Sequence, residues 1–231
     1  MCGRYTIIPK AKGNSRAVKL LQEFQARYNA APSQALPVIT SAEPDKLQFF
    51  HWGLLPHWSK DREYKHKPIN ARAETLTEKP TFKSLLTQKR CLVPADSFFE
   101  WRSVGKTKKP YRIQLKSEEL FTFAGLWDEW VDKQTGEVEH TFTIITTTAN
   151  EMVKPLHERM PVMLHPDEEN LWLTDAGGAN QTHLNMLRPY PAEEMKLYAV
   201  TEFVNAASHD SPPGPARAAA GNRAFRSRRD V

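Results

Sequence analysis

The sequence predicts an α+β fold: a single domain built on a mostly antiparallel β-sheet or partial barrel, with a few flanking helices. Its 231 residues, 40% hydrophobic and 26% charged, fit one sizeable globular domain with a buried core. Short segments rich in β-branched and aromatic residues outnumber segments with helical periodicity. These strand-like segments follow one another in runs instead of alternating with helices, which favours antiparallel pairing.

The expected elements follow from these patterns in chain order. We predict strands at 2–8, 36–40, 47–52, 90–94, 97–102, 111–115, 121–127, 140–148 and 195–201. The β-branched run at 140–148 is the clearest of them. Helices are predicted at 15–28, 81–86, 150–154 and 167–173, with Ser15 as the cap of the first. Turns or loops are expected at 29–32, 41–46, 53–67 and 105–109.

Composition sets the domain limits and the compartment. We expect one domain over residues 1–206 and a flexible tail rich in Ala, Pro and Arg over 207–231. No apolar run approaches the ~20 residues of a membrane span, and the N-terminus has no apolar signal core. Two cysteines do not form a disulfide framework, and a reducing cytoplasm suits them. We therefore predict a cytoplasmic protein with no membrane partner.

Charge is distributed unevenly along the chain. Residues 1–112 carry 21 Lys and Arg against nine Asp and Glu, whereas residues 113–206 carry six against 16. A basic half joined to an acidic half suggests a positive face that attracts a polyanion. The alternative is that the two halves neutralise each other on folding, and charge alone does not decide between these readings.

Cys2 is the first candidate for chemistry. Removal of Met1 would leave a 1,2-aminothiol, with an α-amine of pKa ~8 beside a thiol of pKa ~8.5. Both groups would be partly deprotonated near neutral pH. An aldehyde forms an imine with such an amine, and the thiol then closes a five-membered thiazolidine. The alternative is that a cysteine at the second position is incidental.

Two further segments pair a polar side chain with an arginine two residues later. Side chains two apart lie on the same side of an extended chain, so Asn70 is expected beside Arg72, and His157 beside Arg159. Each arginine offers a planar fork for a phosphate, and His157 titrates near neutral pH. The alternatives are an ion pair between Arg72 and a local carboxylate such as Glu74, and an ordinary loop histidine.

A third segment places Glu100 between aromatic residues. Burial there would raise the pKa of the carboxyl into a range useful for acid–base chemistry, and Trp101 could stack on a base. Alternatively, Phe98, Phe99 and Trp101 are core residues and Glu100 points to solvent. We predict no metal site and no cofactor, because neither the cysteines nor the histidines show ligand spacing and no phosphate-binding or dinucleotide fingerprint is present.

Together these segments closely resemble the SRAP family of abasic-site processing proteins. The matching pieces, in the family's order, are Met1–Tyr5, Tyr28–Pro32, Trp52–Pro56 with Trp58, Ile69–Glu74, Arg90–Asp96, Phe99–Trp101, Phe123–Trp127 and His157–Pro161. They span residue 2 to about residue 206. The Ala- and Arg-rich end of the chain does not fit the family pattern. It also lacks the partner-docking peptide that some eukaryotic members carry, so the resemblance implies a bacterial, nucleoid-associated member.

The resemblance implies the SRAP fold, a function and a role for each matching residue. Met1 leaves by self-cleavage, and Cys2 then forms a thiazolidine crosslink with an abasic site in single-stranded DNA. Asn70 orients the amine and the sugar, while Glu100 and His157 transfer protons. The residues implied in DNA binding are Arg4, Arg72, Arg159, Trp58, Trp101 and Pro32. The resemblance thus implies an autopeptidase with a DNA-crosslinking or lyase-type activity and no cofactor, which we expect to be a monomer.

Two other functions remain open. In an N-terminal-nucleophile amidohydrolase, such as a glutamine amidotransferase, Cys2 would attack an amide. A non-covalent module that binds modified DNA would keep full binding without Cys2. A glutaminase assay and a Cys2→Ala variant separate these alternatives from the crosslinking hypothesis.

Overall fold

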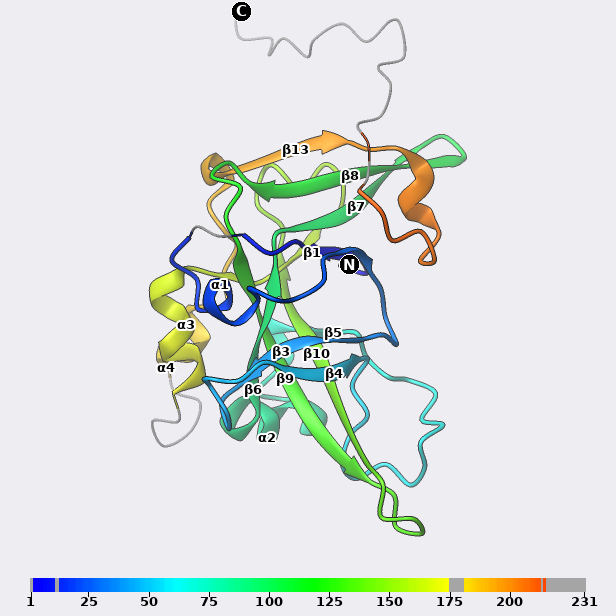
Figure 1. Ribbon diagram of the computed structural model, residues 1–231, viewed down its shortest axis with the longest axis vertical. Coiled ribbons are helices and arrows are strands. Elements are labelled where there is room, and N and C mark those ends of the chain that lie inside the picture. Colours follow the sequence, from blue (N-terminus) through cyan, green and yellow to red (C-terminus); the bar gives the residue numbers. More distant parts are fainter. Residues whose placement is uncertain (1, 11–12, 175–180, 213, 215–231) are drawn as a thin grey trace, which may run out of the picture.

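The computed structural model describes residues 2–10, 13–174, 181–212 and 214, and its strands form two sheets (Figure 1). The smaller sheet is antiparallel throughout. In spatial order its strands are β13 (Met195–Ala199), β8 (Thr107–Leu115), β7 (Ser97–Val104), β1 (Tyr5–Ile7) and β2 (Arg27–Ala30). The N-terminus therefore runs directly into the middle of a sheet.

The larger sheet closes on itself. Its ring consists of β10 (Val138–Thr148), β4 (Gln48–Trp52), β3 (Ala35–Thr40), β6 (Arg90–Ala95) and β9 (Phe121–Val131), and β9 pairs back with β10. Only the β10–β4 pair of this ring is parallel. Three short strands attach to the ring: β5 (Asn70–Arg72) and β11 (Arg159–Pro161) to β10, and β12 (Met163–Leu164) to β9. The predicted single, mostly antiparallel β-domain with barrel character is confirmed.

Short helices flank the strands (Figure 1). They are α1 (Ala17–Leu20), α2 (Pro80–Gln88), α3 (Pro166–Leu173) and α4 (Gln181–Asn185), with 3₁₀ turns η1 (Ala73–Thr75), η2 (Ala192–Glu194) and η3 (Glu202–Asn205). Helix α2 begins at a proline, which suits the first helical turn, and buries Phe82, Leu85 and Leu86. Within the described residues, no helix is long and apolar enough to cross a membrane.

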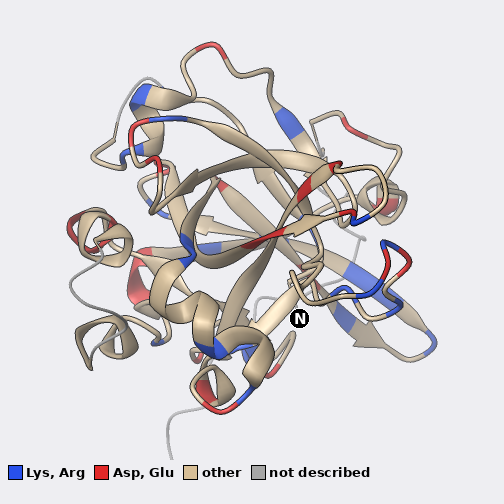
Figure 2. Ribbon diagram, turned by 90° about the horizontal axis from the view of Figure 1, so that it is seen from below, with Lys and Arg blue, Asp and Glu red and all other residues tan. Residues whose placement is uncertain are grey.

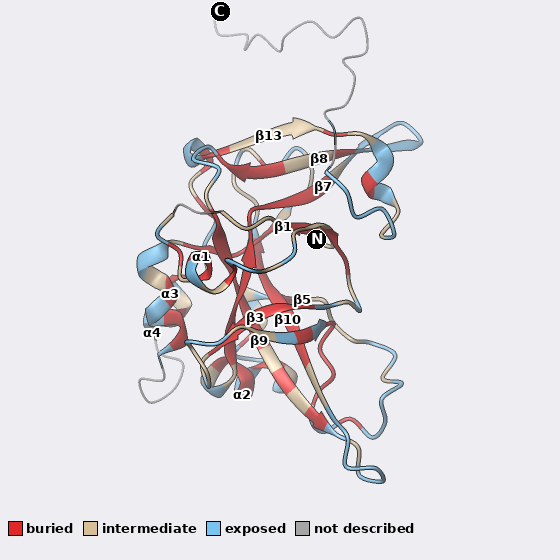
Figure 3. Cartoon of the chain, viewed as in Figure 1, coloured by how far each residue is buried: buried red, intermediate tan, exposed pale blue. Residues whose placement is uncertain are grey.

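One hydrophobic core joins the two sheets (Figure 3). Tyr5 of β1 is fully buried, and its ring packs edge-on against Trp52 of β4 at 5.2 Å and Phe123 of β9 at 5.8 Å between ring centroids. Aromatic pairs of this geometry contribute about 0.5–1.5 kcal/mol beyond the area they bury. Strand β1 is thereby fixed to the barrel, which fixes the position of Cys2 just before it.

The helix predicted over 15–28 is wrong in most of its length. Helix α1 covers Ala17–Leu20 only, and Arg27–Ala30 forms strand β2, so the turn predicted at 29–32 is also partly wrong. The side chain of Ser15 donates to Glu169 at 2.7 Å and accepts weakly from the Ala17 N–H. The backbone from Arg27 onward pairs with β1, and this tertiary contact overrides the local helical pattern.

Two smaller predictions also need correction. The segment predicted as a helix at 150–154 is a series of turns, in which Asn150 Oδ1 accepts from the Val153 N–H. The loop predicted at 105–109 is only two residues long, because β7 continues to Val104 and β8 begins at Thr107. Gly105 has a φ of 61°, as the first central residue of a type II′ hairpin turn requires.

Chain contacts continue past residue 206, where the sequence prediction placed the domain boundary. Asp210 forms an ion pair with Arg27 at 2.6 Å and accepts from the backbone N–H groups of Tyr28 and Asn29. Most of the predicted tail lies outside the described residues. The boundary and the tail's flexibility therefore stay predictions.

Gly125 lies where three strands meet most closely. A Cβ at this position would stand 2.8 Å from Cys91 Sγ, 3.1 Å from Val93 Cγ2 and 3.1 Å from the backbone oxygen of Thr143. We expect Gly125→Ala to lower the free energy of unfolding by about 1–3 kcal/mol, since overpacked cores strain the backbone. Urea denaturation measures this change. Adding Cys91→Ala should restore part of the loss, and a strictly additive double variant would contradict the assigned clash.

Candidate functional site

Cys2 lies at the meeting point of the smaller sheet and the barrel. It directly precedes the β1 segment and is fully buried. Its Sγ lies 3.8 Å from the backbone oxygen of Arg4. Its own backbone carbonyl accepts a hydrogen bond of 2.8 Å from Asn70 Nδ2. Asn70 begins β5, which pairs with β10 of the barrel, so the barrel side chain holds the N-terminal cysteine in place.

Burial and the charge of Glu100 raise the pKa of the Cys2 thiol, with burial the larger cause. The expectation of a partly deprotonated thiol concerns the chain without Met1, and it stays a prediction. Glu100, on β7, is itself buried, so the alternative that it points to solvent is wrong. The interaction between the two groups places an acidic side chain within electrostatic reach of the sulfur.

A cavity of about 490 Å³ opens beside Glu100. It is lined by Glu100, Trp101, Lys108, His157 and Asn205. The backbone N–H of Arg159 donates to His157 Nδ1 at 2.9 Å, so the neutral imidazole carries its proton on Nε2. Residues far apart in the sequence thus line one cavity, and one of them, Glu100, acts electrostatically on Cys2.

The C-terminal 3₁₀ turn η3 forms one wall of this site. Trp101 Nε1 donates to Asn205 Oδ1 at 2.7 Å. Arg4 donates to Asn29 Oδ1 at 3.0 Å and to the backbone oxygens of Val204 and Asn205. In the free protein Arg4 therefore anchors the C-terminal segment. Asn205 is a site residue that sequence reasoning left without a role.

Asn29 is a second residue that the sequence did not single out. It is fully buried, and its Nδ2 donates to the backbone oxygens of Val204, Ala206 and His209. The signal in the sequence was only its place in the Tyr28–Pro32 piece. Asn29 and Arg4 together hold η3 against the sheet that carries Glu100.

Arg159 of β11 and Arg72 of β5 lie on strands that both pair with β10, but the two arginines differ in their contacts. Arg159 makes two hydrogen bonds to the carboxylate of Glu74, at 2.7 and 2.9 Å, and a third to the backbone oxygen of Thr146. The hydrogen bond from Arg159 lowers the pKa of Glu74, and the charge of Arg72 adds to this effect. The alternative reading of Arg72 was an ion pair with Glu74, but the ion pair of Glu74 is made by Arg159. The side chain of Arg72 is exposed.

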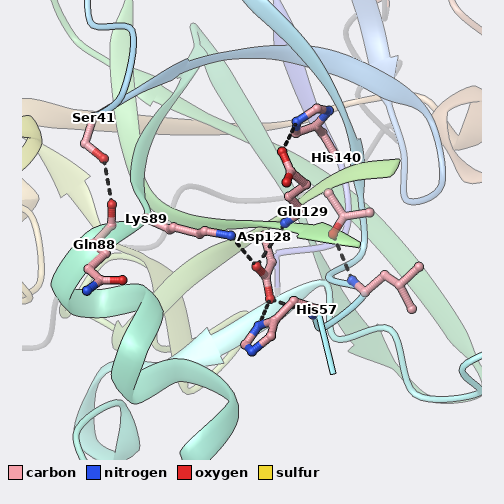
Figure 4. A network of polar contacts seen from close by, with 9 residues as sticks. Ser41, His57, Gln88, Lys89, Asp128, Glu129 and His140 are labelled. Carbon is pink, nitrogen blue, oxygen red and sulfur yellow. Dashed lines mark hydrogen bonds and ion pairs between the residues drawn. The ribbon is translucent and has the colours of Figure 1, made fainter. Parts of the chain in front are cut away.

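Trp58 lies in the loop after β4 and does not line the Glu100 cavity. Its side chain is about half exposed, and its ring meets Tyr64 edge-on at 5.7 Å. The loop is attached to the barrel by a polar cluster beside Trp58 (Figure 4). There, His57 and Lys89 both bind the buried carboxylate of Asp128, at 2.9 and 2.8 Å.

Pro32 is half-buried in the connection between β2 and β3. The next residue, Ser33, has a positive φ of 69° and donates from its backbone N–H to the carbonyl of Trp52. Pro32 thus belongs to a tight turn beside the end of β4, and it does not line the Glu100 cavity either. Across the described part of the chain, no group of His, Cys, Asp and Glu side chains is arranged to hold a metal ion.

The fold and the site define a class of protein: one β-rich domain with a closed barrel and an N-terminal cysteine held beside a buried acid. The model of the SOS response associated peptidase (SRAP) family matches residues 1–207, and the chain belongs to this family. The resemblance deduced from the sequence is confirmed.

Curated relatives carry a common description. The abasic site processing protein YoaM of Bacillus subtilis is 44% identical over 218 residues, which cover 91% of this chain and 96% of that protein. The abasic site processing protein YoqW of the same organism is 42% identical over 219 residues, covering 92% and 97%. The abasic site processing protein HMCES of Gallus gallus is 33% identical over 221 residues, covering 82% of this chain and 65% of that protein.

Solved structures share the fold. A crystal structure of a protein from Bacteroides thetaiotaomicron matches with a TM-score of 0.79 and 32% identity, covering 90% of this chain and 97% of that chain. A structure from Bordetella bronchiseptica, at 23% identity, matches in fold with a TM-score of 0.73 and covers 87% and 100%.

Proposed function

We propose that this chain processes abasic sites in single-stranded DNA by forming a covalent thiazolidine link through Cys2, after Met1 has been removed. Membership of the SRAP family and the descriptions of the bacterial relatives support abasic-site processing. The covalent link follows from the chemistry of an N-terminal cysteine. A protein of this kind acts in the cytoplasm, on the nucleoid.

The observation that carries the proposal is the position of Cys2. Asn70 holds the cysteine's backbone carbonyl, and the charge of Glu100 acts on its sulfur. Glu100 also lines the cavity that contains His157. Glu100 thus acts on the Cys2 sulfur and borders the cavity that contains His157, and this supports the proposal because thiazolidine formation needs an amine, a thiol and proton-transferring groups.

The proposed reaction consumes one water when Met1 is removed and releases one water when the imine forms. Hydrolysis of the Met1–Cys2 peptide bond consumes one water, releases methionine and leaves an α-amine on Cys2. That amine adds to the aldehyde carbon of the ring-opened abasic sugar, and loss of one water gives an imine. The Cys2 sulfur then adds to the imine carbon, and the thiol proton passes to the nitrogen.

Protons move at three points in this sequence: sugar ring opening, dehydration to the imine, and thiol addition. Burial raises the pKa of the Cys2 thiol, so the sulfur needs a base to lose its proton near neutral pH. Glu100 and His157 are the groups assigned to these transfers. Asn70 orients the new N-terminus through its hydrogen bond to the Cys2 carbonyl.

The arginines assigned to DNA binding differ in the hydrogen bonds within the protein that they would have to break or share in order to bind a phosphate. The exposed Arg72 can bind a phosphate directly, whereas Arg159 would have to share its guanidinium with Glu74, and Arg4 with η3. Trp101 borders the cavity and can stack on a base. Trp58 and Pro32 lie outside the cavity and are assigned to the path of the strand beyond it. The protein is proposed to act as a monomer.

Intact-mass spectrometry tests the proposal directly. The purified protein should lack one methionine. After mixing with an abasic single-stranded oligonucleotide, a new species should appear at the summed mass of protein and DNA minus one water. The control is the same oligonucleotide with its aldehyde reduced to an alcohol, which should give no such species. Retention of Met1, or DNA binding without this mass, would overturn the proposal.

A further inference from the structure

The β7–β8 hairpin extends from the cavity as a basic surface. Its exposed cationic side chains are Arg102, Lys106, Lys108 and Lys109. Between residues 101 and 117 the sequence contains no acidic residue. Figure 2 shows these cations along a hairpin that projects from the body of the molecule. Within this stretch no carboxylate offsets the positive charge.

The pairing of the hairpin places like charges against each other. Arg102 lies directly opposite Lys109 in the β7–β8 register. Among the described residues neither side chain has an ion-pair partner. Like charges directly opposite on one face of a sheet are destabilising. The arrangement therefore costs stability in the free protein, and a bound polyanion would reverse the sign of this contribution.

Lys108 connects this surface to the cavity. It lines the cavity together with Glu100, Trp101 and His157, although its ammonium plays no part in the chemistry of Cys2. Trp101 pairs with Pro110 and Ser103 with Lys108, so the ring of Trp101 lies on the same face of the hairpin as Lys108. Aromatic side chains interleaved with cations are the arrangement that binds a single nucleic acid strand without reading its sequence.

We propose that the β7–β8 hairpin is a phosphate-binding surface for the DNA segment on one side of the abasic nucleotide. This inference rests on the proposed function and adds to it a surface beyond the arginines already assigned. From Glu100 to Val104 the strand extends roughly 13 Å. That length corresponds to at most about four nucleotides, because ~3.4 Å is the rise per nucleotide in a duplex and an unpaired strand extends further. The hairpin therefore contacts the first few phosphates beyond the cavity.

The test uses a variant with Arg102→Gln, Lys106→Gln and Lys109→Gln, which leaves the cavity residue Lys108 unchanged. Its affinity is measured for a single-stranded oligonucleotide with a tetrahydrofuran abasic analogue, which has no aldehyde and cannot react. Neutralising three phosphate contacts should weaken binding on the order of tenfold at moderate salt, and should reduce the slope of log affinity against log salt by about 2. Adduct yield at saturating reactive DNA should equal that of the wild type.

The matched control removes the same charge elsewhere. Lys79, Lys83 and Lys133 are exposed on α2 and the β9–β10 turn, away from the hairpin (Figure 1). Changing these three lysines to Gln should leave affinity and salt slope near the wild-type values. An equal loss in the control would show a general charge effect and overturn the inference. Since only exposed side chains change, the hairpin variant should unfold at an equal or higher urea concentration.

Flank length gives a second, independent readout. Oligonucleotides are shortened stepwise on either the 5′ or the 3′ side of the lesion. Wild-type affinity should fall as one flank drops below about four nucleotides, and the hairpin variant should be insensitive to that flank. If the variant binds like the wild type, the inference is wrong while crosslinking stands. If the wild type forms no adduct but the hairpin variant still binds DNA more weakly than the wild type, the proposed function is wrong and the assignment of the hairpin as a DNA-binding surface is supported.

Discussion

A Cys2→Ala variant is expected to form no adduct that survives denaturing electrophoresis, while the wild type converts abasic single-stranded DNA to a stable product. Alanine is small enough for Met1 to be removed by an aminopeptidase, so the variant can still present an α-amine. That amine can form an imine with the sugar aldehyde. Without the sulfur no ring closes, and the open imine hydrolyses.

Borohydride trapping makes this prediction sharper. Reduction converts an imine to a stable amine, so the variant should give a trapped adduct with borohydride and none without it. Cys91→Ala is the matched control, because Cys91 is the other free, buried cysteine and lies in β6 of the barrel. It should crosslink like the wild type. A stable, untrapped adduct with Cys2→Ala would show that sulfur is not required and would refute the thiazolidine.

The fold was predictable wherever the pattern was local and strong. Strand β10 reads as a β-branched run and is buried on both faces, since it pairs within the barrel and packs against the core. The failure at residues 15–28 has the opposite cause. Asn29 binds carbonyls of residues 204, 206 and 209, which lie far away in the sequence. No local periodicity carries that information.

In the site, too, features set by local sequence patterns were predictable, whereas contacts between residues far apart in the sequence were not. Spacing and resemblance were enough to single out Cys2, Asn70, Glu100 and His157, and the structure brings Glu100 and His157 to one cavity. The partner of Arg159 could not be read from spacing, because Glu74 lies 85 residues earlier in the chain. Pairing of β5 and β11 with the same strand, β10, creates that contact. Lys108 was missed because it stands in a segment predicted as a loop.

Arg90 supports the second large prediction, which concerns stability. Its side chain is fully buried at the start of β6. The guanidinium donates to the backbone oxygens of Leu86 and Thr87 at the end of α2, and of Trp172 and Thr174 at the end of α3. Carbonyls at helix C-termini have no partners within the helix and carry partial negative charge. One cation therefore joins two helix ends to the barrel.

We expect Arg90→Met to lower the free energy of unfolding on the order of 3–5 kcal/mol, since buried carbonyls would lose their donors at once. Arg90→Lys should lose less, because it keeps the charge, but a single ammonium cannot reproduce the planar fork. Urea denaturation measures both. Arg188, in an exposed ion pair with Glu168, is the control, and Arg188→Met should cost less than about 1 kcal/mol. If both Met variants lowered the free energy of unfolding by the same amount, the buried hydrogen bonds of Arg90 would not contribute more to stability than the ion pair of Arg188. Below its unfolding transition, Arg90→Met should still crosslink abasic DNA, because Arg90 lies outside the Cys2 site.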